Sequence, residues 1–454
     1  MSTDFNDTIV ALATPPGIGA IGVIRVSGPR AIELINEIFR GKDLTEVVSH
    51  TIHLGTIRNN EEIIDEVLVS LFKGPNSYTK EDVIEISSHG SPYILQRILT
   101  LIVTKGARLA KPGEFTQRAF LNGRFDLAQA EAVADLIASE NASMQQTAMN
   151  QMRGGFSGEI KNLREQLVHF ASMIELELDF AEEDVEFADR KGLISLIDKI
   201  QVLIKSLIAS FEYGNAIKNG IPTVIAGKPN AGKSTLLNAL LNEEKAIVSS
   251  IPGTTRDFIE DQLVIDGIAF RFIDTAGLRE TDDEIESIGV ARTQEKMQQA
   301  SLVIYLIDLE NDSIVEVKEQ IIDLKKSSVP FLIVGNKADS GNSELVEWLN
   351  GKEGSIMISA KEKKNLDELR GRLKSFVAAP SQSDVVVTNA RHLQSLQQTN
   401  EALDRVINGI NSGISNDLVA QDIRSALYHL GEITGEVTTD DLLENIFSKF
   451  CIGK

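Results

Sequence analysis

Residues Gly227-Lys228-Pro229-Asn230-Ala231-Gly232-Lys233-Ser234 fit the pattern G-x-x-x-x-G-K-[ST] of a phosphate-binding loop. Residues 222–226 before the loop are apolar and β-branched, which predicts a buried strand, and residues 235–241 after it predict the first turns of a helix. In that context the backbone N–H groups of the loop and the positive helix N-terminus bind phosphate oxygens. The alternative is a glycine turn that only joins a strand to a helix, and it is disfavoured because three companion motifs follow in order.

The chemistry of such a loop gives its polar side chains specific tasks. We expect Lys233 to bridge the β- and γ-phosphates and the Ser234 hydroxyl to bind Mg²⁺. The predicted nucleotide contacts in this loop are Asn230, Ala231, Gly232, Lys233, Ser234 and Thr235.

Three further motifs follow predicted strands, and together they indicate GTP. In Asp274-Thr275-Ala276-Gly277 the carboxylate can reach Mg²⁺ through water and the Gly277 amide can meet the γ-phosphate. In Asn336-Lys337-Ala338-Asp339 the last carboxylate can accept from guanine N1–H and the 2-amino group, which adenine lacks. Ser359-Ala360-Lys361 fits a backbone contact to guanine O6. The order of the motifs places GTP at the carboxyl edge of a parallel sheet and predicts a GTPase domain over residues 218–378.

The segment between the first two motifs carries the expected switch residues. We expect Thr255 to complete the Mg²⁺ shell, whereas Arg256 is either an arginine finger supplied in cis or an ordinary solvated charge. Leu278 stands where many small GTPases place a water-orienting Gln, so another group must position the attacking water. Residues 279–289 contain five acids that could do this, and spacing alone selects none of them.

Composition limits the kind of protein that this chain can be. Its 454 residues suffice for about three domains, and 42% hydrophobic with 24% charged residues is typical of a soluble globular protein. The net charge of −21 argues against a broad basic surface for nucleic acid, although a local patch remains compatible with it. Cys451 has no second cysteine for an intrachain disulfide, and no apolar run reaches transmembrane length, so we expect a cytoplasmic protein without stable membrane insertion.

The rest of the chain predicts a multidomain fold of α/β and α parts. Residues 1–120 read as an α+β domain, with strands at 7–14, 20–28, 67–72 and 82–87 and helices at 31–40 and 91–105. Helical spacing dominates residues 121–217 and 379–454, on both sides of the predicted GTPase domain. We therefore expect one helical domain into which a GTPase domain, a mostly parallel sheet with helices on both faces, is inserted.

Several segments outside the nucleotide motifs carry a family resemblance that runs from end to end. They are Thr14-Pro15-Pro16-Gly17, Pro112-Gly113-Glu114-Phe115-Thr116, Leu127-Ala128-Gln129-Ala130-Glu131-Ala132 and the terminal Cys451-Ile452-Gly453-Lys454. With the GTPase motifs they make the chain similar to the MnmE, or TrmE, family of tRNA-modification GTPases. The terminal C-x-G-K joined to an inserted GTPase domain is much more specific than the GTPase motifs themselves.

The resemblance implies a tetrahydrofolate-binding N-terminal domain that also forms a constitutive homodimer. It implies that the chain forms a hetero-oligomer with the FAD-binding partner MnmG and modifies C5 of the wobble uridine of certain tRNAs. The added aminomethyl or carboxymethylaminomethyl group would take its carbon from 5-formyl- or methylene-tetrahydrofolate. GTP hydrolysis would drive a cycle in which the GTPase domains dimerise.

The resemblance also assigns residues by motif. Arg25, Glu85, Arg124 and Lys454 stand where the family contacts 5-formyltetrahydrofolate. The resemblance implies a bound potassium ion, which can offset the charge that develops on the transferring phosphoryl group. Its ligands would be the Asn230 side chain and three residues of the following loop, Ser249, Ile251 and Thr254. The whole loop, Ser249-Ser250-Ile251-Pro252-Gly253-Thr254, would also contact GTP. Glu286 would position the attacking water, and Cys451 would act in the modification as a nucleophile or an acid.

Two other functions remain open at this point. A dimeric GTP switch for assembly or signalling would need no modification chemistry and should not bind 5-formyltetrahydrofolate. A ribosome-assembly GTPase would need a basic RNA-binding appendage, which the acidic composition does not indicate. The folate residues and the C-terminal motif favour the modification enzyme.

Overall fold

The computed structural model describes residues 6–179, 190–244, 261–273, 299–326, 329–352, 354–377 and 385–454. The chain forms two compact units. The first comprises Met1–Ala138, Ala148–Ile204 and Gln394–Lys454, and the second comprises Ser139–Thr147 and Lys205–Leu393. None of the helices in the described ranges combines the length and the hydropathy that a membrane span needs.

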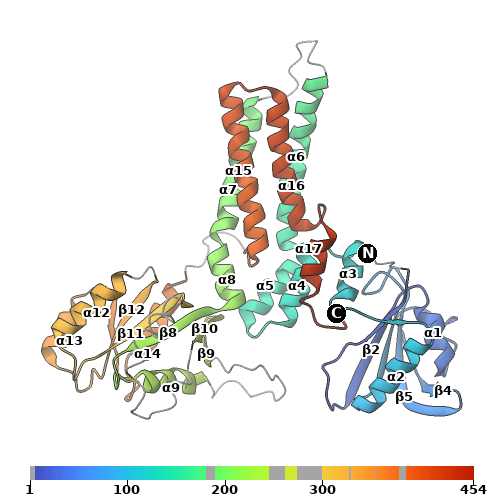
Figure 1. Ribbon diagram of the computed structural model, residues 1–454, viewed down its shortest axis with the longest axis horizontal. Helices are drawn as coiled ribbons and strands as arrows, with labels where there is room; N and C mark the ends of the chain where they lie inside the picture. The colour runs from blue at the N-terminus through green and yellow to red at the C-terminus, as the bar shows by residue number, and fades with distance from the viewer. Residues whose placement is uncertain are drawn as a thin grey trace. The chain divides into compact units, whose positions relative to one another are not determined.

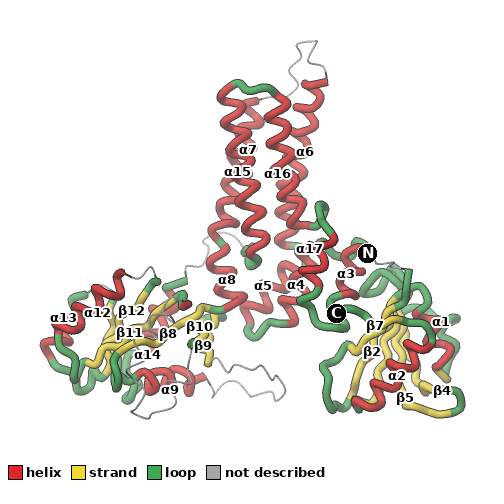
Figure 2. The backbone as a smooth tube through the Cα atoms, viewed as in Figure 1, coloured by secondary structure: helices red, strands yellow, loops and turns green. Residues whose placement is uncertain are grey.

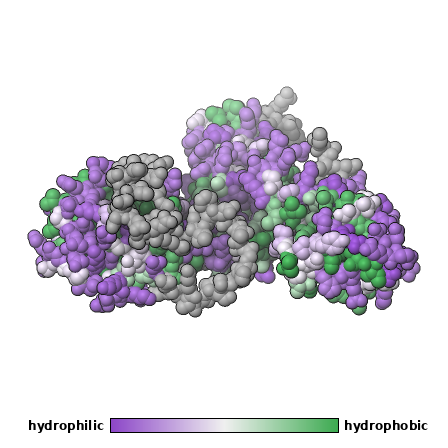
Figure 3. Space-filling view, turned by 60° about the horizontal axis from the view of Figure 1, so that its bottom comes forward, coloured by the Kyte–Doolittle hydropathy of each residue, from purple (hydrophilic) through white to green (hydrophobic). Residues whose placement is uncertain are grey.

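Over the residues coloured in Figure 3 the surface is mostly hydrophilic, with hydrophobic residues in smaller groups.

The first unit contains a seven-stranded sheet of order β3-β4-β5-β6-β2-β1-β7. Its neighbouring strands are antiparallel except β1 and β7. The strands are β1 (Ile9–Leu12), β2 (Ile21–Ser27), β3 (Phe39–Arg40), β4 (Thr51–Asn59), β5 (Glu62–Phe72), β6 (Val83–His89) and β7 (Arg108–Leu109). This mixed sheet confirms the α+β class of the N-terminal part.

Two amphipathic helices, α1 (Ala31–Ile38) and α2 (Pro92–Thr104), cover one face of this sheet. Leu34 and Ile98 from these helices pack with Ile24 and Ile86 of the strands because alternate strand residues point to the same face. The sequence predicted a helix over residues 31–40. The prediction is wrong for the last two residues, because Phe39–Arg40 forms the short strand β3 and pairs with β4.

The helices of the first unit come from both sides of the nucleotide domain in the sequence. They are α3 (Glu114–Leu121), α4 (Leu127–Ile137), α6 (Gly155–Asp179), α16 (Asn416–Thr434) and α17 (Asp440–Phe447), with parts of α5 (Ala142–Met152), α7 (Arg190–Ala209) and α15 (Ala390–Ser412). Helices α6 and α16 pack side by side (Figure 1), and Gln201 of α7 donates to Asp404 of α15 at 2.7 Å. The two helical segments that flank the nucleotide motifs therefore pack together, as the sequence predicted.

The second unit contains a six-stranded sheet of order β13-β12-β11-β8-β10-β9 (Figure 2). Of these strands only β9 is antiparallel to its neighbour. Its strands are β8 (Ile221–Gly227), β9 (Asp261–Ile265), β10 (Ile268–Phe272), β11 (Leu302–Asp308), β12 (Phe331–Asn336) and β13 (Ser355–Met357). Its helices are α8 (Phe211–Asn219), α9 (Lys233–Glu244), α12 (Ile314–Lys326), α13 (Ser343–Asn350) and α14 (Leu366–Ser375).

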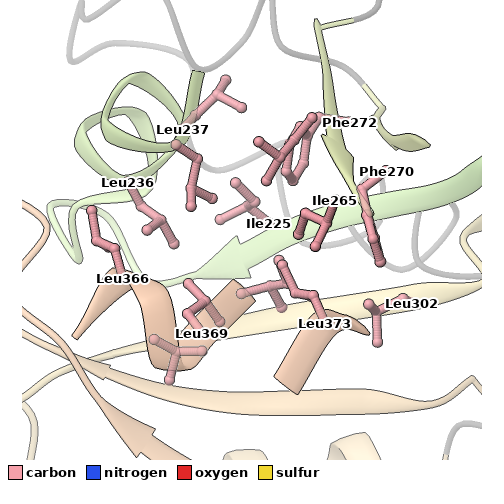
Figure 4. Packing of buried hydrophobic residues seen from close by; sticks show 14 of the residues in the cluster. Ile225, Leu236, Leu237, Ile265, Phe270, Phe272, Leu302, Leu366, Leu369 and Leu373 are labelled. Carbon is pink, nitrogen blue, oxygen red and sulfur yellow. The ribbon is translucent and has the colours of Figure 1, made fainter. Parts of the chain in front are cut away.

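Apolar packing on both faces holds this sheet in place. Helices α9 and α14 cover one face, where Leu236 and Leu369 lie in the same cluster as Phe270 (Figure 4). Helices α12 and α13 contribute Val317 and Leu345 to another cluster, together with Ile307 and Ile333 of the strands. A mostly parallel sheet covered on both faces by helices is the fold that the glycine loop and its companion motifs predicted.

Candidate functional site

The phosphate-binding loop joins β8 to α9 and requires glycine at two positions. Gly227 has φ +148°, and a Cβ there would lie 2.5 Å from the carbonyl oxygen of Leu306. Gly232 has φ +95°, and a Cβ there would lie 2.2 Å from Nδ2 of Asn336. Both the backbone conformation and the close approach of neighbouring groups therefore exclude larger residues.

The Lys233 ammonium lies within the curl of this loop. Its Nζ donates to the carbonyl oxygens of Gly227 at 2.9 Å and Lys228 at 2.8 Å. Ser234 is half-buried in the first turn of α9, while Asn230, at φ +59°, and Thr235 are exposed. The loop therefore brings a cation, a hydroxyl and the N-terminus of a twelve-residue helix together, as phosphate binding requires.

The Asn336 side chain connects three of the predicted nucleotide segments. Its Nδ2 donates to the carbonyl oxygen of Ala231 at 2.8 Å, and its Oδ1 accepts from the backbone N–H of Ala360 at 3.0 Å. The carboxyl ends of β8, β12 and β13 lie along one edge because these strands run parallel. This edge also carries Asp339, whose pKa is held below its ordinary value chiefly by a hydrogen bond with Ser359. An exposed ionised carboxylate is available there for a guanine N–H edge.

Sequence reasoning missed two acidic partners of this site, one at the end of β11 and one in the segment that follows it. Asp308 pairs with the Lys337 ammonium at 2.6 Å and accepts from the side chain of Asn311. Asp312 pairs with Lys228 at 2.9 Å and accepts from the backbone N–H of Asp308. Acids at and just beyond the carboxyl end of a buried parallel strand were the available signal, since such positions meet at the ligand edge of the sheet.

Many predicted site residues lie outside the described residues. The predicted potassium and switch loop is one such group: Ser249, Ser250, Ile251, Pro252, Gly253, Thr254, Thr255 and Arg256. The second group is the predicted Mg²⁺ and γ-phosphate motif with the two residues discussed after it: Asp274, Thr275, Ala276, Gly277, Leu278 and Glu286. Lys361 is described and is exposed.

The first unit holds a separate pocket of about 560 Å³ beside β2 and β6. Arg25 and Glu85 are cross-strand partners there, and Nε of Arg25 donates to Oε1 of Glu85 at 2.9 Å. The guanidinium groups of Arg25 and Arg124 lie 5.0 Å and 5.1 Å from the centre of the Tyr78 ring. The Tyr78 hydroxyl is 2.9 Å from Oγ1 of Thr116, which fixes the ring.

The C-terminal tail reaches the same residues from the other end of the chain. Nη1 of Arg25 donates to the carbonyl oxygen of Gly453 at 3.2 Å. Gly453 has φ +93°, and a Cβ there would lie 2.4 Å from the carbonyl oxygen of Leu12. Burial and the charge of Arg25 lower the pKa of Lys454, an effect that Glu85 and Cys451 oppose. The Cys451 thiol is free and exposed.

The structure thus gathers the four residues that the resemblance assigns to a folate ligand. Arg25, Glu85 and Arg124 line the pocket, and Lys454 lies within electrostatic reach of Arg25 and Glu85. The donor set suits a ligand with a polar heterocycle and an anionic tail. A carboxylate can accept from ring N–H groups, the guanidinium groups and the ammonium can bind carboxylates, and the volume is that of a small-molecule pocket.

Comparisons with known proteins extend over both units. Residues 8–124 match the family described as GTP-binding protein TrmE N-terminus, and residues 127–451 match the MnmE helical domain. The tRNA modification GTPase MnmE of Cytophaga hutchinsonii is 60% identical over 454 residues, which cover 100% of this chain and 99% of that protein. The MnmE of Christiangramia forsetii is 53% identical over 471 residues and covers 99% of each chain. The G domain of the T. maritima FeoB iron transporter aligns with 35% of this chain and 99% of its own, at 22% identity and a TM-score of 0.25.

Proposed function

The chain belongs to the MnmE family of tRNA modification GTPases, and from this premise we propose that it hydrolyses GTP in the service of tRNA modification. The observation that carries the proposal is 60% identity along the whole chain to a protein of that name. The phosphate loop, its bond to Asn336 and the separate pocket that the C-terminal tail reaches support the proposal, because one protein would then hold a nucleotide site and a second ligand site.

We propose that GTP binds along the carboxyl edge of the second unit's sheet. The loop amides and Lys233 would neutralise the phosphates, Asp339 would accept from the guanine N–H groups, and a backbone amide of the segment Ser359-Ala360-Lys361 would meet O6. Mg²⁺ would bind to the Ser234 and Thr255 hydroxyls, since hydroxyl oxygen suits a hard cation.

Potassium is proposed to bind the Asn230 side chain and the loop from Ser249 to Thr254. Bound there, it would offset the charge that develops in phosphoryl transfer. The exposed position of Asn230 at the tip of the phosphate loop is compatible with this task. Glu286 would hold the attacking water in line.

The pocket of the first unit is proposed to bind 5-formyl- or methylene-tetrahydrofolate, which would supply the one-carbon unit. Arg25, Glu85, Arg124 and Lys454 would bind and orient this molecule. Cys451 would act on the modification itself, as a nucleophile or an acid. The proposal is supported by the convergence of β2, β6 and the C-terminal tail on one site.

Partners are proposed from the family as well. A second copy of the chain would cover part of the first unit's sheet, where Ile52, Leu54 and Leu68 are exposed on one face. The FAD-binding MnmG would complete the tRNA-modifying complex. The GTPase domains would dimerise and separate during the GTP cycle, in the cytoplasm. The boundaries 1–120, 121–217, 218–378 and 379–454 remain our proposal for the domains.

Nucleoside mass spectrometry of bulk tRNA from the source organism, with and without this gene, tests the function. We expect the wobble uridines with C5-aminomethyl-type groups to disappear on deletion and to return with the wild-type gene. If these nucleosides persist in the deletion strain, the GTPase activity stands alone and the dimeric GTP switch replaces the modification enzyme.

A further inference from the structure

Two neighbouring cations at the pocket of the first unit have only neutral partners. Lys80 and Arg124 both line the pocket. Nζ of Lys80 donates to the carbonyl oxygen of Gly123 at 2.9 Å, and Nη1 of Arg124 donates to the carbonyl oxygen of Ser77 at 2.5 Å. Within the described ranges, the hydrogen bonds of these two side chains therefore involve no carboxylate. Lys80 donates to the residue directly before Arg124, so both cations belong to the same part of the pocket lining.

Two arginines of this region, by contrast, are neutralised by acids. Arg25 pairs with Glu85 at 2.9 Å, and the buried Arg118 pairs with both Asp7 and Glu114. The chain as a whole has 66 acidic and 45 basic residues. In so acidic a chain, two cations at one pocket whose hydrogen bonds go to carbonyl oxygens produce a local positive field. Such a field favours an anionic ligand.

The backbone at Lys80 gives a second, independent indication. Its φ is +62°, in the left-handed region that residues with a Cβ rarely adopt. A strained backbone conformation lowers the stability of the fold. Where such strain is kept at the edge of a ligand pocket, it supports a role of that residue in function. The strain holds a lysine at the rim, where its side chain lies along Gly123.

Aromatic contacts fix Arg124 next to Lys80. Its guanidinium lies 5.1 Å from the ring centres of both Tyr78 and Phe125. Arg25, paired with Glu85, contacts the same Tyr78 ring at 5.0 Å. The pocket therefore offers a neutralised pair in one part and two unneutralised cations in another.

We propose that Lys80 and Arg124 form a subsite for the carboxylates of a γ-linked oligoglutamate tail, so that this pocket prefers tetrahydrofolates that carry several glutamates. The inference rests on the proposed assignment of the pocket to a tetrahydrofolate. Each additional γ-linked glutamate adds one net negative charge, and the exposed rim lets the tail leave the pocket toward solvent. The Arg25–Glu85 pair is then left for the heterocycle.

The test is a titration of the full chain with 5-formyltetrahydrofolate carrying one or three glutamates, by isothermal titration calorimetry. We expect the wild-type protein to bind the triglutamate about tenfold more tightly at low ionic strength, and this ratio to shrink as salt screens the charges. Lys80→Gln should lower the ratio by roughly three- to fivefold. Lys73→Gln is the matched control, because it removes the same charge outside the pocket lining, and its ratio should equal that of the wild type.

A second variant separates charge from folding. Lys80→Gly relieves the positive φ, so the fold should remain and the ratio should still fall as it does in Lys80→Gln. The subsite is overturned if the wild type binds the triglutamate and the monoglutamate with equal affinity, or if both Lys80 variants keep the wild-type ratio of these affinities. In either case, binding of the monoglutamate would still support the assignment of the pocket to a folate. If the wild type binds neither compound, the proposed folate pocket itself fails, and the subsite fails with it.

Discussion

The side-chain amide of Asn336 donates to the carbonyl oxygen of Ala231 at 2.8 Å, across 105 residues of sequence. The same side chain accepts from the backbone N–H of Ala360. It is 3% exposed, so water does not compete for these bonds. One buried amide thus ties the phosphate loop to both segments that are expected to recognise guanine.

Replacing this amide should therefore weaken both the fold and nucleotide binding. Asn336→Ala leaves the Ala360 N–H and the Ala231 carbonyl without their partner, at a cost of about 2 kcal/mol of unfolding free energy. We expect GTP affinity to fall by at least tenfold in a titration with a fluorescent GTP analogue. Asn342→Ala is the control, since Asn342 only caps α13. Equal losses of GTP affinity in the two variants would contradict the role of Asn336.

Glu286→Ala should separate binding from turnover. If this carboxylate positions the attacking water, its removal keeps the affinity for GTP and lowers hydrolysis by roughly a hundredfold or more. Phosphate release measured in potassium buffer gives the turnover, and Glu280→Ala in the same acidic segment is the matched control. Hydrolysis at the wild-type rate in Glu286→Ala would reject the assignment.

The acid stability of the first unit should depend on Glu114. This carboxylate is 2% exposed, and its burial acts to raise its pKa. The hydrogen bonds and charge of Arg108, together with hydrogen bonds from Lys111 and Arg118, outweigh burial and hold the pKa of Glu114 below its ordinary value of 4.5. The stabilisation is therefore present above pH 4.5 and is lost as pH falls through the lowered pKa of the folded state. Glu114→Gln should cost about 3 kcal/mol near pH 7 and should flatten this loss.

Urea unfolding between pH 7 and pH 3 measures this dependence. Far-UV circular dichroism reports the whole chain, whereas the fluorescence of Trp348, the only tryptophan, reports the second unit. We expect the variant to change the transition of the first unit and to leave the Trp348 transition in place. An unaltered slope of stability against pH in Glu114→Gln would show that other carboxylates dominate.

Gly453→Ala should displace the C-terminal tail from the pocket. A Cβ at this position would approach the carbonyl oxygen of Leu12 to 2.4 Å, and the Gly453 carbonyl would lose its bond to Arg25. We expect binding of 5-formyltetrahydrofolate to weaken by about tenfold in calorimetry, with little change in GTP hydrolysis. Gly413→Ala is the control, because Gly413 also has a positive φ of +67° but no atom within 4 Å of the added Cβ. Similar folate affinity in the two variants would argue against the role of the tail.

Local patterns determined much of the second unit. The phosphate loop, the strand before it and the helix after it follow from a few neighbouring residues, since glycine conformations and apolar periodicity act over short distances. The guanine motifs were found in the same way, directly after buried strands. In the first unit, β4 was missed because its apolar residues Ile52 and Leu54 are exposed and do not mark a buried face.

The glycine loop and the apolar periodicity therefore sufficed to predict the mostly parallel sheet and the helical flanks, and the family resemblance named the candidate site residues. Which of these residues come together is a property of the folded chain. Arg25, Glu85 and Gly453 lie far apart in the chain, yet hydrogen bonds join them at one site. Asp308 and Asp312 lie at and beyond the end of a strand that no motif marks, yet ion pairs join them to the other site. Such contacts depend on strand register and on closure of long loops, which no local pattern of residues encodes.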